Sequence, residues 1–361
     1  MRTFFTSIII FLSVWFTPAH SAVVPSNTSA QVLTASDLDS WLSGFMAPVM
    51  ETEQLAGAVV VVVKDGKVLL QRGYGYADMA KKVKVNPETT MFRPGSISKL
   101  FSWTAVMQLV EKGKIDLDAD INKYLDFTIV GKGGKPITVR HLLTHRAGFQ
   151  ELGKNPIFED QKLLFSLEAF VKRHTPARIF EPGAMPAYSN YGASLAGYIV
   201  QRVSGMTFDT YIERHIFAPL EMNYSTFRQP LPPRFLSSMS KGYGVSGGDA
   251  QGFEMMNDVP AGGLSASGAD MAKFMIAHLE SGSPILKSET THLMHTSIVK
   301  AFPQLPGMAL GFYQSDVNGH RVIAHSGDLV RFHSDLSLFL DDGVGIFISM
   351  NSEGCRQDRC P

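Results

Sequence analysis

A serine and a lysine three residues apart offer the first chemistry in this sequence. In the segment from Ser96 to Lys99 the two side chains share one face if the segment opens a helix. An ammonium in that position can lower the effective pKa of the hydroxyl or take its proton, and a helix N-terminus favours developing negative charge. The pair is therefore a candidate nucleophile and base.

The Ser-x-x-Lys spacing is a weak signal alone, because it occurs three times. The other two copies begin at Ser238 and Ser297. Ser96 differs because Arg93-Pro94-Gly95 ends extended chain before it and helical apolar spacing from Leu100 to Val110 follows it. A helix-capping serine is the plainer alternative for Ser96.

Two further segments accompany this pair. Tyr188-Ser189-Asn190 is the only Tyr-x-Asn in the chain, and His325-Ser326-Gly327 ends an expected strand. Together, in this order, the three segments resemble the signatures of the serine β-lactamase and penicillin-binding-protein superfamily. They are most similar to its branch of class C β-lactamases, His-x-Gly D-Ala-D-Ala carboxypeptidases and β-lactamase-like esterases. Stretches that look like that family's connecting signatures extend the resemblance over about residues 36–352: Phe92–Gly95, Ile137–His145, Pro182–Gly183, Ile216–Leu220 and Pro260–Leu264.

The resemblance implies a role for each residue of these segments. Ser96 attacks a carbonyl and becomes acylated, while Lys99 and Tyr188 share the proton transfers. Asn190 orients Lys99 and the substrate amide. The backbone N–H groups of Ser96 and Asp328 form the oxyanion hole. The remaining substrate contacts come from the third segment, namely His325, Ser326 and Gly327.

His325 departs from the pattern of β-lactamases, which usually carry lysine there. An imidazole with an ordinary pKa near ~6.5 is mostly neutral at pH 7 and attracts a substrate carboxylate less strongly. His325 therefore favours carboxypeptidase or esterase chemistry over efficient β-lactam hydrolysis. Arg331 could supply the positive charge instead, although an arginine on a solvated strand edge is the plainer interpretation.

Strand patterns at both ends of the chain predict the scaffold for these residues. The β-branched run from Ala58 to Val63, the turn Asp65-Gly66 and the return from Val68 to Gln71 predict a hairpin. Three more strands are expected over Arg321–His325, Asp335–Leu340 and Val344–Met350. We expect an α/β (α+β) fold in which an antiparallel sheet of about five strands is flanked by helices and carries an inserted all-helical lobe.

The expected organisation follows from these elements. A discontinuous sheet domain takes residues 22–95 and 268–361, and a helical lobe takes residues 96–267. The lobe includes a helix with Phe208 and Tyr211 on one face. A short first helix after Ser36 has four large apolar residues on one face: Leu38, Trp41, Leu42 and Phe45.

Composition excludes several classes of protein. Of 361 residues 45% are hydrophobic and 18% are charged, which is a globular balance. Lys and Arg total 33 and so do Asp and Glu, so there is no basic field for nucleic acid. Residues 1–21 read as a signal peptide, with an apolar run from Phe4 to Phe16, which implies an exported, periplasmic or secreted protein and no transmembrane segment after cleavage.

The C-terminus differs from the family pattern. A long helix normally follows the last strand there, whereas only residues 352–361 remain, so we expect one face of the sheet to be partly uncovered. Cys355 and Cys360 lie in this tail and could pair in an oxidising compartment.

Other motifs carry weaker chemistry. The Gly-x-Ser-x-Gly pattern over residues 244–248 lies in a glycine-rich loop, not between a strand and a helix. The pairs His141/His145 and His292/His295 have metal-compatible spacing but no Glu, Asp or Cys nearby, so we expect no metal and no cofactor.

The sequence thus predicts an exported serine hydrolase that acts through an acyl-enzyme on an ester or amide, with weak β-lactamase activity as an option. Its substrate would be a small molecule or derive from peptidoglycan. The alternative is an inactive penicillin-binding-like protein that binds peptidoglycan fragments or a protein partner.

Overall fold

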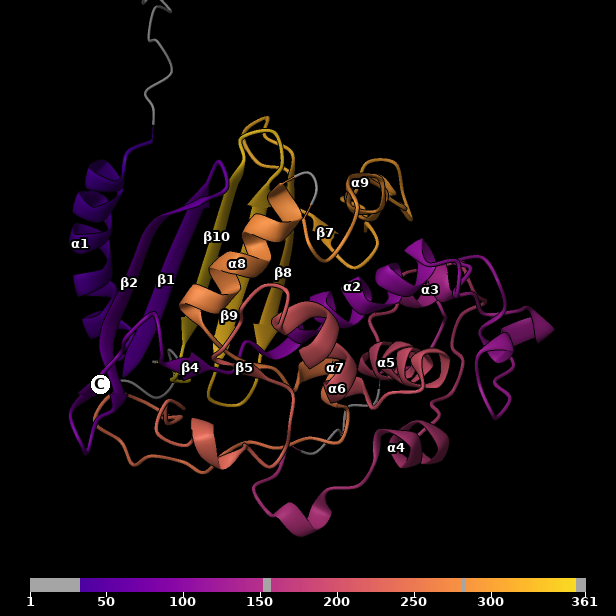
Figure 1. Cartoon of the computed structure of the whole chain (residues 1–361), viewed down its shortest axis with the longest axis horizontal. Coiled ribbons are helices and arrows are strands. Elements are labelled where there is room, and N and C mark those ends of the chain that lie inside the picture. Colours follow the sequence, from indigo (N-terminus) through magenta and orange to yellow (C-terminus); the bar gives the residue numbers. More distant parts are fainter. Residues whose placement is uncertain (1–32, 152–156, 281–282, 355–361) are drawn as a thin grey trace, which may run out of the picture. The chain divides into compact units, whose positions relative to one another are not determined.

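A seven-stranded antiparallel sheet carries the fold of the computed structural model, which describes residues 33–151, 157–280 and 283–354. This sheet belongs to the unit Ala35–Pro361. The strand order is β3-β2-β1-β10-β9-β8-β7, so strands from both ends of the sequence meet at the centre of the sheet (Figure 1). The bounds are β1 Gly57–Lys64, β2 Lys67–Asp78, β3 Val83–Lys84, β7 Tyr313–Gln314, β8 Val322–Asp328, β9 His333–Phe339 and β10 Val344–Met350.

The antiparallel sheet is confirmed, and its strand count is higher than expected. The five expected strands correspond to β1, β2, β8, β9 and β10. The two others, β3 and β7, lie at the edges and have two residues each, which is too short for an alternating pattern to show in a sequence.

The central strand β1 is apolar from Gly57 to Val63 because helices cover both of its faces. Val59, Val61 and Val63 belong to the main core beneath α8 (Gly268–Leu279). Ala58 and Val60 face α1 (Ala35–Thr52) in a second cluster. Figure 1 shows α8 lying across the sheet and α1 beside β2.

The first helix turns a different face to the sheet from the one expected. Leu42 and Met46 are its buried residues, whereas Trp41 and Phe45 are 60% and 47% exposed. The two exposed rings stack on each other with centroids 4.9 Å apart. Residues four apart form one narrow stripe along a helix, and one such stripe fits against a sheet. Leu42 and Met46 form the buried stripe of α1, so Trp41 and Phe45 on the neighbouring stripe stay exposed.

Helices make up most of the regular secondary structure between β4 and α8. Helix α2 has buried residues on every side and packs against α5, which explains why its apolar pattern is continuous. A small sheet of order β4-β6-β5 links this region to the segment before Ser96. The helices are α2 Ser98–Glu111, α3 Val139–Leu143, α4 Leu167–Arg173, α5 Asn190–Ser204, α6 Phe208–Ile212, α7 Val259–Gly262 and α9 Ser288–Thr296. The strands are β4 Met91–Phe92, β5 Ser225–Thr226 and β6 Ser265–Ser267.

Several expectations fall on residues outside the described ranges. The signal peptide over 1–21 and the pairing of Cys355 with Cys360 both lie there. So does the tail after Gly354. Within the described ranges, the longest apolar helices fall short of what a bilayer span requires.

A pair of buried histidines joins α8 to α9 behind α2. His278 Nδ1 lies 3.1 Å from His295 Nε2, and His278 Nε2 lies 3.2 Å from the hydroxyl of Thr104. Burial lowers the pKa of His278 to about 3 and the pKa of His295 well below its usual value. Both rings are therefore neutral in the folded protein at physiological pH.

This pair predicts a loss of stability in mild acid. At a pH between the folded and the unfolded pKa of each histidine, the unfolded chain binds more protons than the folded one. The free energy of unfolding therefore falls as pH drops below ~6.5, by about 1.4 kcal/mol per pH unit for each histidine. Chemical denaturation at pH 7.5 and 5.0 measures this. The double variant His278→Gln, His295→Gln should lose less stability over this interval than the wild type does. The control His292→Gln, which alters an exposed ring, should lose as much stability as the wild type. Equal losses in all three proteins would contradict the prediction.

Candidate active site

Ser96 lies in a tight turn that runs directly into α2. The turn spans Gly95–Ile97, and Gly95 adopts a left-handed φ of +53° that other residues rarely tolerate. Ser98 secures the turn, because its hydroxyl donates to the Gly95 carbonyl and accepts from the backbone N–H of Leu264. Ser96 therefore sits at a fixed helix start, as expected.

Lys99 contacts Ser96 directly. Its Nζ lies 2.9 Å from Ser96 Oγ and 2.8 Å from the carbonyl oxygen of Ala261. The side chain is completely buried, and burial lowers the pKa of Lys99 to about 7, although the charges of Asp258 and Glu151 oppose this shift. Desolvation thus outweighs both carboxylates, and neutral Lys99 is accessible near physiological pH.

Tyr188 completes a cluster around the serine oxygen. Its hydroxyl donates to Ser96 Oγ at 2.7 Å, and Lys99 Nζ lies 4.8 Å from the centre of its ring. Burial raises the pKa of Tyr188 far above its ordinary value. The tyrosine is therefore a neutral phenol in the resting site, a proton donor and not a phenolate base.

His145 positions Tyr188, a role that the sequence did not suggest. Its backbone has a φ of +50°, and its Nδ1 accepts the backbone N–H of Ser189 at 3.2 Å. Its ring lies 4.5 Å from the Tyr188 ring, centroid to centroid. Next to it, Arg146 donates to the carbonyls of Gly183 and Ala184. These contacts fix the chain that leads to Tyr188.

Two glycines bring the sheet edge against the turn that carries Ser96. A methyl group at Gly327 would lie 2.0 Å from the Pro94 carbonyl oxygen and 2.7 Å from the Ser96 nitrogen. A methyl group at Gly95 would lie 2.8 Å from the Asp328 nitrogen. The end of β8 therefore packs backbone to backbone on the turn, which draws together the two N–H groups proposed for the oxyanion hole.

His325 is buried in the middle of β8. Its Nδ1 donates to the carbonyl of Ser326 at 2.6 Å, and its side chain is 1% exposed. Burial, aided by the charge of Lys99, lowers the pKa of His325 to about 3. The imidazole is neutral, in agreement with the expected weak attraction for a carboxylate. Arg331 pairs with Glu353 at 3.4 Å and lies outside the cavity at Ser96.

Asn190 has a partner that the sequence did not reveal. Glu151 accepts hydrogen bonds from both its backbone N–H and its side-chain amide, each at 2.9 Å. Among the described residues, Asn190 makes no hydrogen bond to Lys99. Asn190 lines the cavity at Ser96. Its contact with substrate remains a prediction.

A cavity of about 110 Å³ lies directly at Ser96. Its two charged lining residues, Asp258 and Asp328, are both acidic. Asp258 precedes α7, the short helix that also supplies the Lys99 carbonyl partner. The full lining is Ser96, Ile157, Asn190, Met256, Asp258, Ala261, Gly262, Asp328 and Leu329.

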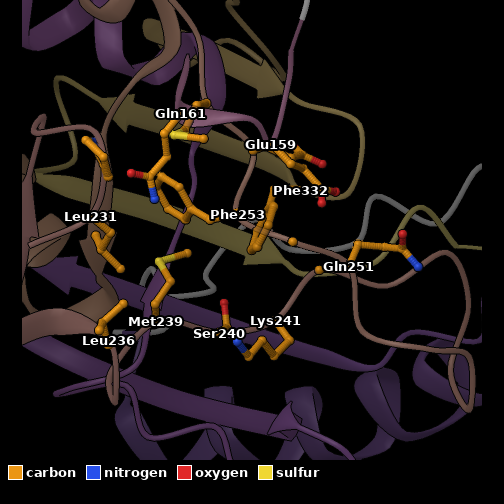
Figure 2. Close-up of a pocket in the computed structure, with 15 residues that line it drawn as sticks. Glu159, Gln161, Leu231, Leu236, Met239, Ser240, Lys241, Gln251, Phe253 and Phe332 are labelled. Atoms are coloured by element: carbon orange, nitrogen blue, oxygen red, sulfur yellow. The ribbon is translucent and has the colours of Figure 1, made fainter. Parts of the chain in front are cut away.

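A larger, more apolar cavity of about 280 Å³ is lined by Phe253 and Phe332 among others (Figure 2). Met255 lines it while its neighbour Met256 lines the cavity at Ser96. Arg93 is fully buried behind Phe253, with its guanidinium carbon 4.6 Å from the ring centre. The apolar lining is Leu231, Leu236, Met239, Phe253, Met255 and Phe332.

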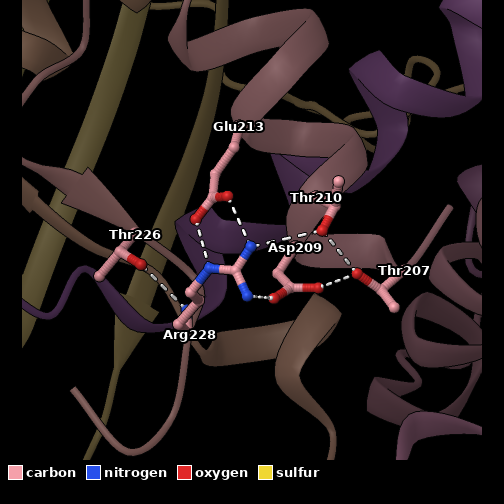
Figure 3. Close-up of polar contacts among 6 residues, drawn as sticks. All are labelled: Thr207, Asp209, Thr210, Glu213, Thr226 and Arg228. Atoms are coloured by element: carbon pink, nitrogen blue, oxygen red, sulfur yellow. Dashed lines mark hydrogen bonds and ion pairs between the residues drawn. The ribbon is translucent and has the colours of Figure 1, made fainter. Parts of the chain in front are cut away.

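An ion-pair network holds the loop that carries Arg228 (Figure 3). The Arg228 guanidinium contacts Glu213 at 2.7 Å and Asp209 at 2.6 Å, which ties its loop to the helix beginning at Phe208. The next residue, Gln229, accepts the backbone N–H of Met256 at 2.8 Å. The network thus reaches the cavity wall at Met256.

The competing motifs have structural explanations in the described residues. Ser238 lies in a turn, Ser297 ends α9, and the glycine-rich stretch 244–248 is a loop. His141 Nδ1 accepts the backbone N–H of Thr138 in a capping box. Across the described ranges, His, Cys, Asp and Glu side chains do not gather in groups that could hold a metal ion.

Comparisons with known proteins show which sequences and structures this chain is similar to. The family model described as beta-lactamase matches residues 41–360. A beta-lactamase of Yersinia enterocolitica is 27% identical over 336 residues, which cover 91% of this chain and 81% of that protein. Protein flp of Staphylococcus aureus (strain N315) is 26% identical over 84% of this chain, which spans only 61% of the length of that relative. The solved structure of an octameric penicillin-binding protein homologue from Pyrococcus abyssi matches with a TM-score of 0.76 and 27% identity, covering 87% of this chain and 73% of that one.

The close approach of Gly327 predicts that Gly327→Ala disables the serine. The added methyl must displace the backbone of Pro94 or Ser96, and the loss of one oxyanion donor costs about 10²- to 10³-fold in other enzymes. We expect labelling of Ser96 by a fluorophosphonate to slow by at least about 100-fold. Gly244→Ala, where a methyl meets open space, is the matched control. Wild-type labelling of a folded Gly327→Ala protein would refute the packing argument.

Proposed function

The chain belongs to the beta-lactamase family, and we propose that it is a serine hydrolase that forms an acyl-enzyme at Ser96 on an ester or amide substrate. The observation that carries the proposal is the contact of Ser96 Oγ with both Lys99 and Tyr188, at 2.9 and 2.7 Å. A serine that merely caps a helix requires neither partner.

Acylation follows from the protonation states of the site. Neutral Lys99 takes the proton of Ser96 as Oγ attacks the carbonyl carbon. The tetrahedral oxygen receives hydrogen bonds from the N–H groups of Ser96 and Asp328. The phenol of Tyr188, already directed at Oγ, gives its proton to the leaving group as the bond to the carbonyl carbon breaks, and it regains a proton from Lys99, which is then neutral again.

Deacylation uses the same groups in reverse order. A water molecule attacks the acyl carbon and gives its proton to Lys99, and the Ser96 oxygen recovers a proton as the acid leaves. Lys99 keeps its position between Ser96 and the carbonyl of Ala261 during the cycle, so one buried amine serves both half-reactions.

The substrate class follows from the third segment. A neutral, buried His325 offers little attraction to the carboxylate that β-lactams and D-Ala-D-Ala peptides carry, so of the two activities expected from the sequence, esterase and carboxypeptidase, it favours the esterase. This supports an ester or an amide without that carboxylate as the better substrate, with β-lactam hydrolysis weak. The apolar run from Phe4 to Phe16, followed by small residues before Ala22, supports export.

Hydrolysis of p-nitrophenyl acetate and butyrate tests the proposal. The wild type should turn over both esters, and Ser96→Ala should reduce the rate by at least about 10³-fold, as removal of a nucleophile does elsewhere. Ser297→Ala changes a serine with the same Ser-x-x-Lys spacing and should retain full activity. Ester hydrolysis that survives Ser96→Ala would overturn the mechanism. Absence of turnover in the wild type would favour the non-catalytic binding alternative.

The pKa of Lys99 predicts the pH dependence. Because the base must be unprotonated, kcat/KM should rise as pH increases through about 7. Glu151→Gln removes a charge that favours protonated Lys99, so its profile should rise at lower pH than that of the wild type. Glu289→Gln, on the exposed side of α9, should leave the profile unchanged. A profile that is flat between pH 5 and 9, or a shift to higher pH in Glu151→Gln, contradicts this account.

A further inference from the structure

The cavity lined by Phe253 and Phe332, which we call the Phe253 cavity, has room for a small ligand. Its volume of about 280 Å³ exceeds the roughly 150 Å³ of an engineered apolar cavity that binds benzene. Met255 lines it, and the next residue, Met256, lines the cavity at Ser96. Among the described residues the two cavities have no lining residue in common, so the Phe253 cavity is a separate space next to the candidate active site.

Two phenylalanine rings line this cavity without an aromatic partner. Figure 2 shows Phe253 and Phe332, from distant segments, around the same space. Within the described ranges neither ring packs against another aromatic ring, whereas the buried rings of Phe101 and Phe274 stack with centroids 3.9 Å apart. Aromatic rings prefer offset-stacked or edge-to-face contacts with one another. A ligand ring in the cavity would supply those contacts to Phe253 and Phe332.

Arg93 strengthens the preference of Phe253 for a second ring. Its guanidinium carbon lies 4.6 Å from the centre of the Phe253 ring, and its side chain is fully buried outside the cavity lining. The ring therefore stands between the cation and the cavity. A cation over one face attracts the π electrons of the ring. The opposite face becomes less negative and makes a better contact for the electron-rich face of another ring.

Two thioethers complete the surroundings of a ligand ring. Met239 and Met255 line the same cavity, and methionine sulfur makes favourable contacts with aromatic rings. Leu231 and Leu236 add apolar surface that would accept an aliphatic chain as readily as a ring. The methionines and phenylalanines together thus favour an aromatic ligand over an aliphatic one of the same size.

The buried acid in the wall of this cavity interacts with the protein itself. Glu254 is 5% exposed, and burial raises its pKa. The charge of Arg93 and the backbone N–H groups of Val330 and Arg331 oppose that rise. These groups already stabilise the carboxylate, so recognition does not require a cationic ligand, and an anionic ligand would be repelled.

We propose that the Phe253 cavity is a binding site for a small uncharged molecule, which it recognises through an aromatic ring that packs on Phe253 and Phe332 and contacts the sulfurs of Met239 and Met255. This site is separate from the serine, so the inference goes beyond the proposed function and does not depend on it.

Benzyl alcohol and cyclohexylmethanol test the proposal, because they differ only in whether the ring is aromatic. The saturated alcohol is the more apolar, so burial of apolar surface alone predicts that it binds at least as tightly. NMR titration of the protein labelled with ¹³C-methyl methionine measures both Kd values at Met239 and Met255, each assigned by its absence in the leucine variant. We expect the Kd of benzyl alcohol to be about two- to tenfold lower. The resonance of Met46, in α1 outside this lining, should not move.

Variants then locate the aromatic contact. Phe253→Leu keeps an apolar side chain at a half-buried position and removes one ring, so it should bring the ratio of the two Kd values towards one. Phe302→Leu removes an exposed ring outside the lining and should leave the ratio unchanged. Leu236→Asp serves if Phe253→Leu does not fold. Leu236 is 62% exposed and lines the cavity, so a carboxylate there should weaken the binding of both alcohols severalfold.

Three results would overturn the inference. One is equal or tighter binding of cyclohexylmethanol, and another is the absence of any shift at Met239 and Met255 up to the solubility limit of benzyl alcohol. The third is a preference for benzyl alcohol that persists undiminished in Phe253→Leu, or binding unchanged in Leu236→Asp where that variant is used. Because the measurement is of binding and requires no turnover at Ser96, each of these results leaves the proposed hydrolase untouched.

Discussion

The burial of the Lys99 ammonium is the constraint on which the site depends. An amine with no exposed surface would be costly to keep charged, and among the described residues its hydrogen-bond partners are Ser96 Oγ and one carbonyl oxygen. The carboxylates of Asp258 and Glu151 reduce this cost without removing it. The amine therefore loses its proton near pH 7, and it contacts the hydroxyl of a serine in the turn that leads into the same helix.

Much of the architecture serves this contact. The sheet edge must reach the helix start, and glycine at positions 95 and 327 permits an approach that any side chain would block. Helix α7 returns Ala261 to Lys99 and at the same time places Asp258 in the cavity. The buried His145 and its neighbour Arg146 hold the chain before Tyr188. Elements from distant parts of the sequence thus meet at a single serine oxygen.

The sequence predicted the parts whose signals are local. Ser96 and Lys99 are three residues apart, and the strands of the central sheet are long enough for their pattern to show. The two-residue strands β3 and β7 were too short to detect, and the outward face of Trp41 and Phe45 depends on where α1 meets the sheet. Glu151 and His145 carry no signal in sequence, because their roles arise from contacts with residues about forty positions away.

Asp258 lines the cavity and also acts on the base, because its carboxylate opposes the fall in the pKa of Lys99. The central claim is that Lys99 is a base with a lowered pKa. NMR titration of the lysine side chains, with the Lys99 resonance assigned by its absence in Lys99→Arg, measures this value directly. The account predicts a midpoint near pH 7. A midpoint close to the ordinary value of about 10.4 would contradict it, because Lys99 could then not take the serine proton at physiological pH.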